Sequence, residues 1–314
     1  MVVTDSTASL PPAEAERWGI EVVPLEVAVG DVRYREGVDL DPTRLVRALQ
    51  DGTRVTTSQP APAAFAAAYA RAAGRGADAI VSLHLSGDLS GTVRGAGLAA
   101  AQAAVPVHVV DSRSVAMGLG FAALAAARAA RAQSGVPVPG EGASADVPVP
   151  GVIAPDVAVP DAAGADVVAP DVAAAHVVAR ASEVAASASA LFAVDSLEHL
   201  RRGGRIGAAA EAVGTLLGTR PLLTVDGGRV EVAGTARTRR AARARLVDVA
   251  ATAATRERAR VAVHHLGQHD VAEVLAAEIR DRLGDGTEVL VVEVSAVLGA
   301  HAGPGVLGVV VAEG

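Results

Sequence analysis

The sequence predicts an α/β protein of two α/β domains, an N-terminal parallel-sheet domain and a C-terminal mixed-sheet domain. Short apolar runs typical of buried strands alternate with Ala-rich runs typical of helices along most of the 314 residues. Hydroxyl-rich or acidic turns follow several of these strands, as at the carboxyl edge of a parallel sheet. A Pro-rich stretch divides the pattern, so we expect domains at residues 1–135 and 173–314.

Local signals set the boundaries of elements in the first domain. Pro12 suits the first turn of a helix, and Gly19 is a typical helix stop. Gly30 and Asp31 favour a hairpin turn between two strands. On these grounds we expect strands at residues 2–3, 20–29, 32–35, 79–85 and 105–110, and helices at 11–18, 41–50, 65–73, 92–104 and 118–133.

Residues 136–172 differ from both flanking regions. They repeat Val-Pro and Ala-Pro-Asp units and have almost no helix or strand periodicity. Each proline removes a backbone donor and biases the preceding residue toward extended geometry. We therefore predict a Pro/Ala/Val-rich insert or linker that is semi-extended or disordered.

The second domain again alternates helices and strands. Gly203 and Gly204 end a short helix, and Asp226-Gly227-Gly228 favours a tight hairpin turn. We expect further helices at residues 173–190, 208–217, 237–254 and 271–283. Strands are expected at 191–194, 220–225, from 230 onward, and at 261–263, 288–294 and 306–311.

Composition excludes several kinds of chemistry. The chain has no Cys, and its 28 basic residues are all Arg, so thiolate, Schiff-base lysine and P-loop lysine chemistry are impossible. A formal net charge of −7 argues against generic nucleic-acid binding. The sequence has no apolar run of membrane-spanning length and no basic segment at Met1. We therefore expect a cytoplasmic protein, without membrane insertion and monomeric.

Two hydroxyl-rich turns, residues 56–60 and 85–92, each precede an Ala-rich helical run. The first turn of a helix has unpaired N–H groups and the positive end of the helix dipole. Such turns therefore favour an anion, either a carboxylate or a phosphate. Thr57 and Ser90 could equally be helix N-caps, a role worth about 1 kcal/mol.

Three other functions fit parts of the sequence. A serine hydrolase could use Ser90, His265 and an aspartate, although Ser90 lacks the Gly-x-Ser-x-Gly turn that exposes a nucleophile. The Arg-rich residues 237–260 could bind nucleic acid or, more simply, an acidic partner. His264, His265 and His269 resemble a metal cluster, but no carboxylate completes a ligand set.

Six motifs, in this order, resemble the DegV family over nearly the whole chain apart from the insert. They are Val3-Thr4-Asp5-Ser6-Thr7, Thr57-Ser58-Gln59-Pro60, Leu89-Ser90-Gly91-Thr92, Val110-Asp111-Ser112, Leu200-Arg201-Arg202-Gly203-Gly204-Arg205-Ile206 and His301-Ala302-Gly303-Pro304-Gly305. The resemblance implies a fatty-acid carrier without a cofactor, not a stand-alone enzyme. It would hold one long-chain fatty acid, such as a C16–C18 chain, in an interior tunnel and present its carboxylate to a separate fatty acid kinase.

The resemblance also implies roles for individual residues. Thr57 and Ser90 match hydroxyls that bind the fatty-acid carboxylate. Arg205 matches an arginine of the head-group or product region, and His265, or its neighbour His264, matches a histidine near it. His301 lies in the closing motif, which is expected to line or shape the site. No metal is implied.

Overall fold

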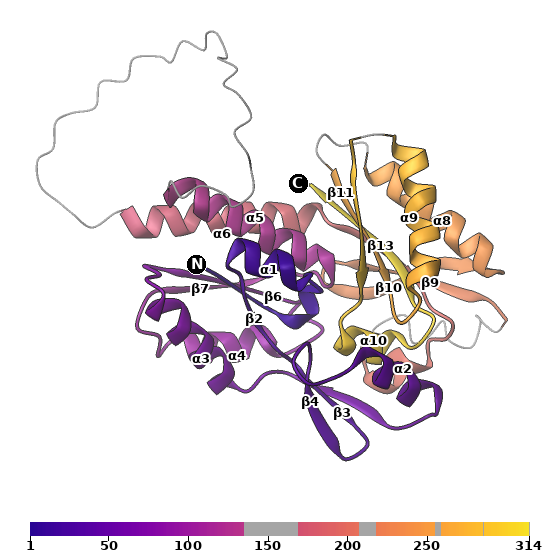
Figure 1. The fold of residues 1–314 in the computed structure, drawn as a ribbon, viewed down its shortest axis with the longest axis horizontal. Coiled ribbons are helices and arrows are strands. Elements are labelled where there is room, and N and C mark those ends of the chain that lie inside the picture. The colour runs from indigo at the N-terminus through magenta and orange to yellow at the C-terminus, as the bar shows by residue number, and fades with distance from the viewer. Residues whose placement is uncertain (135–168, 207–217, 255–258, 285, 314) are drawn as a thin grey trace, which may run out of the picture.

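The computed structural model describes residues 1–134, 169–206, 218–254, 259–284 and 286–313. Most of the predicted insert, and the helix expected at 208–217, lie outside these residues. Two α/β domains are present, the first around a parallel sheet and the second around a mixed sheet, as the sequence predicts (Figure 1). No helix in the described ranges is both long enough and apolar enough to cross a membrane.

The N-terminal sheet has four parallel strands in the order β2 (Glu21–Val23), β1 (Val2–Asp5), β6 (Ile80–His84) and β7 (Val107–Asp111). Helices α3 (Pro62–Gly74) and α4 (Thr92–Ala100) cover one face. The other face is covered by α1 (Pro12–Trp18), α5 (Met117–Ser134) and α6 (Ala169–Ser187). The N-terminal domain is therefore layered helix–sheet–helix, with an Ala-, Val- and Leu-rich core on both faces of the sheet.

Residues 20–29, predicted as one strand, form two strands in different sheets. The break falls at Pro24, which has no N–H for a sheet ladder, and the N–H of Leu25 donates to Oγ of Ser6 (2.9 Å). The second strand, β3 (Glu26–Val29), pairs antiparallel with β4 (Val32–Arg35) and β5 (Val55–Ser58). This small sheet and helix α2 (Pro42–Gln50) pack against the C-terminal domain.

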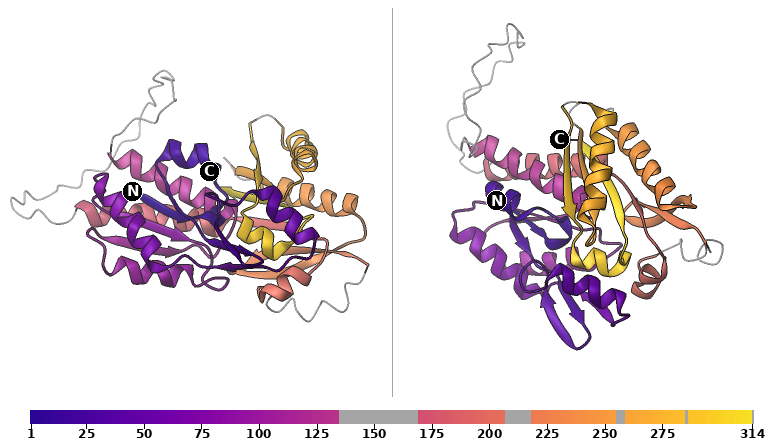
Figure 2. Two further views of the ribbon diagram at one scale, coloured as in Figure 1. Left: turned by 60° about the horizontal axis from the view of Figure 1, so that its bottom comes forward. Right: turned by 45° about the vertical axis from the view of Figure 1, so that its right-hand side comes forward.

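The C-terminal sheet has six strands in the order β10 (Arg229–Ala236), β9 (Arg220–Asp226), β8 (Ser189–Ala193), β13 (Leu307–Glu313), β11 (Ala259–His265) and β12 (Glu288–Glu293). Among the strands that the structure describes in this sheet, β11 and β12 pair in parallel and the other neighbours pair antiparallel. Helices α8 (Arg239–Ala253) and α9 (His269–Leu283) cover its outer face (Figure 2). The inner face meets α5 and the small sheet, which places the domain junction over it.

Two helices differ from the sequence prediction. Helix α6 begins at Ala169, inside the expected insert, and its buried residues Val177, Ala181 and Val184 pack in the same core as α5. Figures 1 and 2 show α5 and α6 side by side. Helix α10 (Ala296–Ala302), where the sequence suggested only a turn, carries His301. The short helix α7 (Glu198–Gly203) ends at Gly204, as expected.

Candidate functional site

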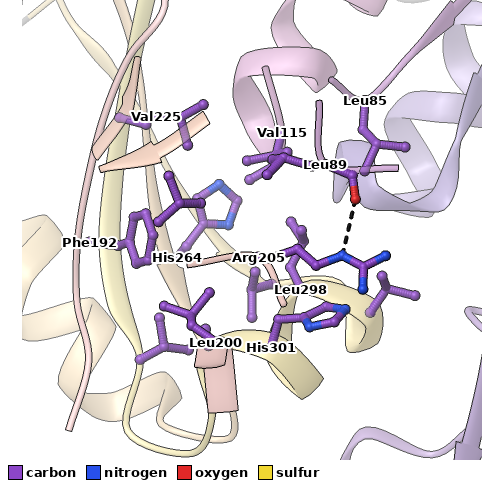
Figure 3. Close-up of a pocket in the computed structure, with 18 of the residues that line it drawn as sticks. Leu85, Leu89, Val115, Phe192, Leu200, Arg205, Val225, His264, Leu298 and His301 are labelled. Atoms are coloured by element: carbon purple, nitrogen blue, oxygen red, sulfur yellow. Dashed lines mark hydrogen bonds between the residues drawn. The ribbon is translucent and has the colours of Figure 1, made fainter. Parts of the chain in front are cut away.

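A pocket of about 120 Å³ lies where the small sheet, the loops of the N-terminal sheet and the inner face of the C-terminal sheet meet. This volume is several times that of a cavity for one water molecule, about 10–15 Å³, so the pocket is more than a packing defect. The wall is mostly apolar (Figure 3). Its apolar residues include Leu25, Leu85, Leu89, Val115, Leu191, Phe192, Val225, Val230, Val294, Val297, Leu298, Val306, Val309 and Val310.

Four of the sequence-predicted site residues line this pocket: Thr57, Ser90, Arg205 and His301. Thr57 lies on β5, and its Oγ1 is 2.9 Å from Nε2 of His301 on α10. Ser90 follows β6, and its Oγ is 2.8 Å from Oγ1 of Thr92. Arg205 donates from Nε to the carbonyl of Leu89 (3.2 Å), which holds its exposed guanidinium beside the loop of Ser90 (Figure 3).

Glycines allow these side chains to approach one another. A Cβ on Gly203 would lie 2.7 Å from Cε1 of His301, so only glycine leaves room for this ring. Gly204 then ends α7 in the left-handed conformation (φ 70°), and the chain continues into Arg205. The Gly pair thus both ends the helix and leaves room for the histidine.

Neither predicted hydroxyl caps a helix. The N-cap of α4 is Gly91 and that of α3 is Ala61, and neither helix has a side-chain cap. Thr57 is a strand residue that pairs with Val27. The helix-capping interpretation of Thr57 and Ser90 is therefore wrong, and both hydroxyls remain on the pocket wall.

The pocket wall carries two histidines and one arginine, and these side chains differ in charge. Burial, together with the nearby charge of Arg205, lowers the pKa of His301 to about 4. Burial also lowers the pKa of His264 to about 4. Both rings are therefore neutral near pH 7, and Arg205 is the one cation on the described part of the wall.

The adjacent histidines of β11 occupy different environments because successive strand residues face opposite sides of a sheet. His264 is on the pocket wall, and its Nε2 accepts the N–H of Met117 at the start of α5 (3.2 Å). The His265 ring contacts His269 of α9, and its Nδ1 accepts the N–H of Gln268 (3.3 Å). The structure therefore brings His264, and not His265, to the other four residues. Within the described ranges, no three metal-ligating side chains are grouped.

The structure does not bring Ser90 and His265 together as a serine hydrolase would require. Ser90 bonds Thr92, not a histidine, and His265 faces α9. A Ser–His–Asp series does exist elsewhere: Oγ of Ser82 is 2.7 Å from Nε2 of His84, whose Nδ1 is 3.0 Å from Oδ2 of Asp5. All three residues have no exposed area, so they cross-link the core of the N-terminal domain and cannot reach a substrate.

The hairpin of β9 and β10 borders the pocket through Val225 and Val230. Oγ of Ser86 donates to the carbonyl of Gly228 (2.6 Å), and Nη2 of Arg113 donates to the carbonyl of Gly227. Arg229 pairs with Asp88 (3.2 Å). These contacts join the C-terminal hairpin to loops of the N-terminal domain, and residues of both partners line the pocket.

The fold and the pocket define a class: two-domain α/β proteins with an apolar pocket between the domains and polar groups at one end. The model of the DegV family matches residues 1–137 and 162–314. A DegV domain-containing protein of Streptomyces coelicolor is 45% identical over 310 residues, covering 99% of this chain and 97% of the relative. The chain therefore belongs to the DegV family.

Two solved structures of the family share the whole fold. A DegV family protein from Thermus thermophilus, described by its fatty acid binding, is 33% identical with a TM-score of 0.79, covering 100% of this chain and 99% of that one. DegV from Bacillus subtilis, described as a fatty acid binding protein, is 28% identical with a TM-score of 0.79, covering 100% and 98%.

Proposed function

We propose that this protein binds one long-chain fatty acid, with the tail along the apolar wall and the carboxylate near Thr57 and Ser90. The observation that carries the proposal is the polarity of the pocket: its hydroxyls, arginine and His301 stand beside a wall of Leu, Val and Phe. A buried carboxylate needs several donors, and a hydrocarbon tail needs none. The description of two relatives as fatty acid binding proteins supports the same ligand.

The proposed head-group set is Thr57, Ser90, Arg205 and His301. The family resemblance implied His265 or His264 as the head-group histidine; we give this role to His301, because its ring contacts Thr57 and lines the pocket. Arg205 supplies the charge-assisted hydrogen bond, and its exposure keeps the head group within reach of a second protein.

The further part of the proposal is that the protein acts as a carrier, not as an enzyme. A partner fatty acid kinase transfers the γ-phosphoryl group of ATP to a carboxylate oxygen, which gives ADP and an acyl phosphate that stays in the pocket. The positive charge of Arg205 would counter the added negative charge of this product.

The experiment that tests ligand binding is mass spectrometry of whatever denaturing extraction releases from the purified protein. About one fatty acid per chain is expected, and the Thr57→Ala/Ser90→Ala variant should lose it. The matched control is Thr53→Ala/Ser134→Ala, which removes two exposed hydroxyls outside the pocket. A wild-type protein that is free of ligand and takes up no added fatty acid would contradict the proposal.

A further inference from the structure

Helix α10 is held at both ends by the small sheet and the loop that follows it. At the C-terminal end, His301 meets Thr57 of β5 (2.9 Å). At the N-terminal end, the N–H of Val297 donates to Oε1 of Glu36 (3.0 Å), the residue after β4. Three further residues of this helix region, Val297, Leu298 and Ala302, line the pocket beside His301.

Glu36 joins three segments that are distant in the sequence. Its Oε2 accepts the hydroxyl of Ser6 (2.5 Å), from the turn after β1, and that hydroxyl in turn accepts the N–H of Leu25 (2.9 Å). Ser295, the N-cap of α10, hydrogen-bonds the Glu36 carboxyl as well. The Ser295 hydroxyl also accepts the N–H of Leu298 (3.2 Å). The N-terminal sheet, the small sheet and α10 thus meet at one carboxyl group.

This position is costly for a carboxylate. Glu36 is 6% exposed, and burial raises its pKa, with the charge of Asp5 adding to the effect. Hydrogen bonds from Ser6, Val297 and Ser295 offset part of this cost. The first N–H groups of a helix have no partner within it, and Glu36 supplies an acceptor for one of them in α10, the N–H of Val297.

We propose that Glu36 is a positioning residue of the head-group site: it fixes the start of α10, and thereby holds His301 against Thr57. Glu36 is not on the pocket wall, so it acts through α10 and not on a ligand directly. Other parts of the wall lie on strands outside this hydrogen-bond network, among them Ala190, Leu191 and Phe192 of β8 and Gly308, Val309 and Val310 of β13. Loss of the Glu36 side chain should therefore weaken binding of the ligand's head group much more than binding of its tail.

The test, which rests on the proposed fatty-acid function, compares the dissociation constants of a fatty acid and of the fatty alcohol of equal length. Wild-type protein should prefer the acid. In Glu36→Ala this preference should fall about tenfold, the equivalent of one lost hydrogen-bond contribution, while affinity for the alcohol changes less than about twofold. Glu36→Gln keeps an acceptor for Val297 and should restore most of the preference.

Matched variants separate positioning from general stability. Glu21→Ala removes a half-buried carboxylate that pairs with Arg71 and Arg75 and does not line the pocket, and it should leave the preference unchanged. Ser295→Ala removes one hydrogen bond to the Glu36 carboxyl and keeps the carboxyl itself. This variant should also lower the preference for the acid, and it replaces Glu36→Ala in the test if Glu36→Ala does not fold. Equal losses for acid and alcohol in the Glu36 and Ser295 variants would overturn the inference.

A measurement without ligand distinguishes this inference from the proposed function. Titration of the His301 ring by NMR, assigned with His301→Gln, should give a pKa near 4 in wild-type protein. In Glu36→Ala the pKa should rise toward 6.5, because a released helix exposes the ring. An unchanged titration would contradict the positioning role. A wild-type protein that binds neither ligand would refute the fatty-acid proposal, whatever the titration shows.

Discussion

Oγ1 of Thr57 and Nε2 of His301 lie 2.9 Å apart, although 244 positions separate the two residues in the chain. The contact joins the small sheet to the last helix, and both residues line the pocket. The head-group end of the pocket therefore exists only when the first and last parts of the chain are packed together. Stability and binding should respond together when this contact is removed.

A double-mutant cycle measures this contact. Thr57→Val and His301→Phe each remove one partner, and the double variant should be less destabilised than the sum of the single variants. The expected coupling in the free energy of unfolding is about 0.5–3 kcal/mol. Denaturant unfolding of the four proteins gives the value, and Thr53→Val, at an exposed site, is the control. Strict additivity would show that the contact contributes nothing.

Acid should destabilise the protein in a defined pH window. His264 and His301 have pKa values of about 4 in the folded state, below the ordinary 6.5, so the unfolded chain binds more protons between these values. The contribution of these neutral histidines to the free energy of unfolding is present in full above pH 6.5 and is lost as the pH falls toward 4. For His264, 4% exposed, it amounts to about 3 kcal/mol.

Denaturant unfolding at pH 7, 6 and 5 checks this dependence. His264→Gln should flatten the fall in the free energy of unfolding, whereas the exposed His176→Gln should leave it unchanged. If the free energy of unfolding fell as steeply with pH in His264→Gln as in wild-type protein, His264 would be excluded as a source of the pH dependence.

Gly203→Ala should weaken ligand binding. The added Cβ would overlap the His301 ring and push it away from Thr57. We expect a loss of about tenfold in fatty-acid affinity, comparable to one lost hydrogen bond. Gly97→Ala is the control, because a Cβ there meets nothing within 4 Å and lies in helix α4. Normal binding by Gly203→Ala would show that the ring can move without consequence.

Ser86→Ala should speed the release of a bound ligand. It removes the hydroxyl that donates to the carbonyl of Gly228, in the hairpin that borders the pocket, and loss of this partner costs about 1–3 kcal/mol. Stopped-flow release of a fluorescent fatty acid should therefore be faster, while Ser134→Ala, at an exposed site, should match wild type. Release that is no faster in Ser86→Ala would mean that ligands leave by another side.

The alternation of strand-like and helix-like runs predicted the fold class, and the six motifs singled out Thr57, Ser90, Arg205 and His301, all of which line the pocket. The choice between His264 and His265 could not be made from the sequence, because every residue of β11 is buried. A strand buried on both faces has no polar alternation to tell one face from the other.

Glu36 had no detectable signal in the sequence. A single acidic residue after a hairpin strand is typical of a solvated loop, and its burial depends on Val297, 261 positions away. Similarly, α10 is only seven residues long. Pro24 marks the break between β2 and β3 in the sequence, but the place of β3 in a separate sheet depends on distant contacts, such as that of Leu25 with Ser6. Long-range contacts decided each of these features.

The shared wall of the pocket has a consequence beyond recognition. Side chains from both domains surround the cavity, so a bound tail would complete the apolar core in which they meet. A ligand that binds only the folded form increases the folded population as its concentration rises. In a cell that degrades unfolded chains, the abundance of this protein would then follow the supply of its own cargo.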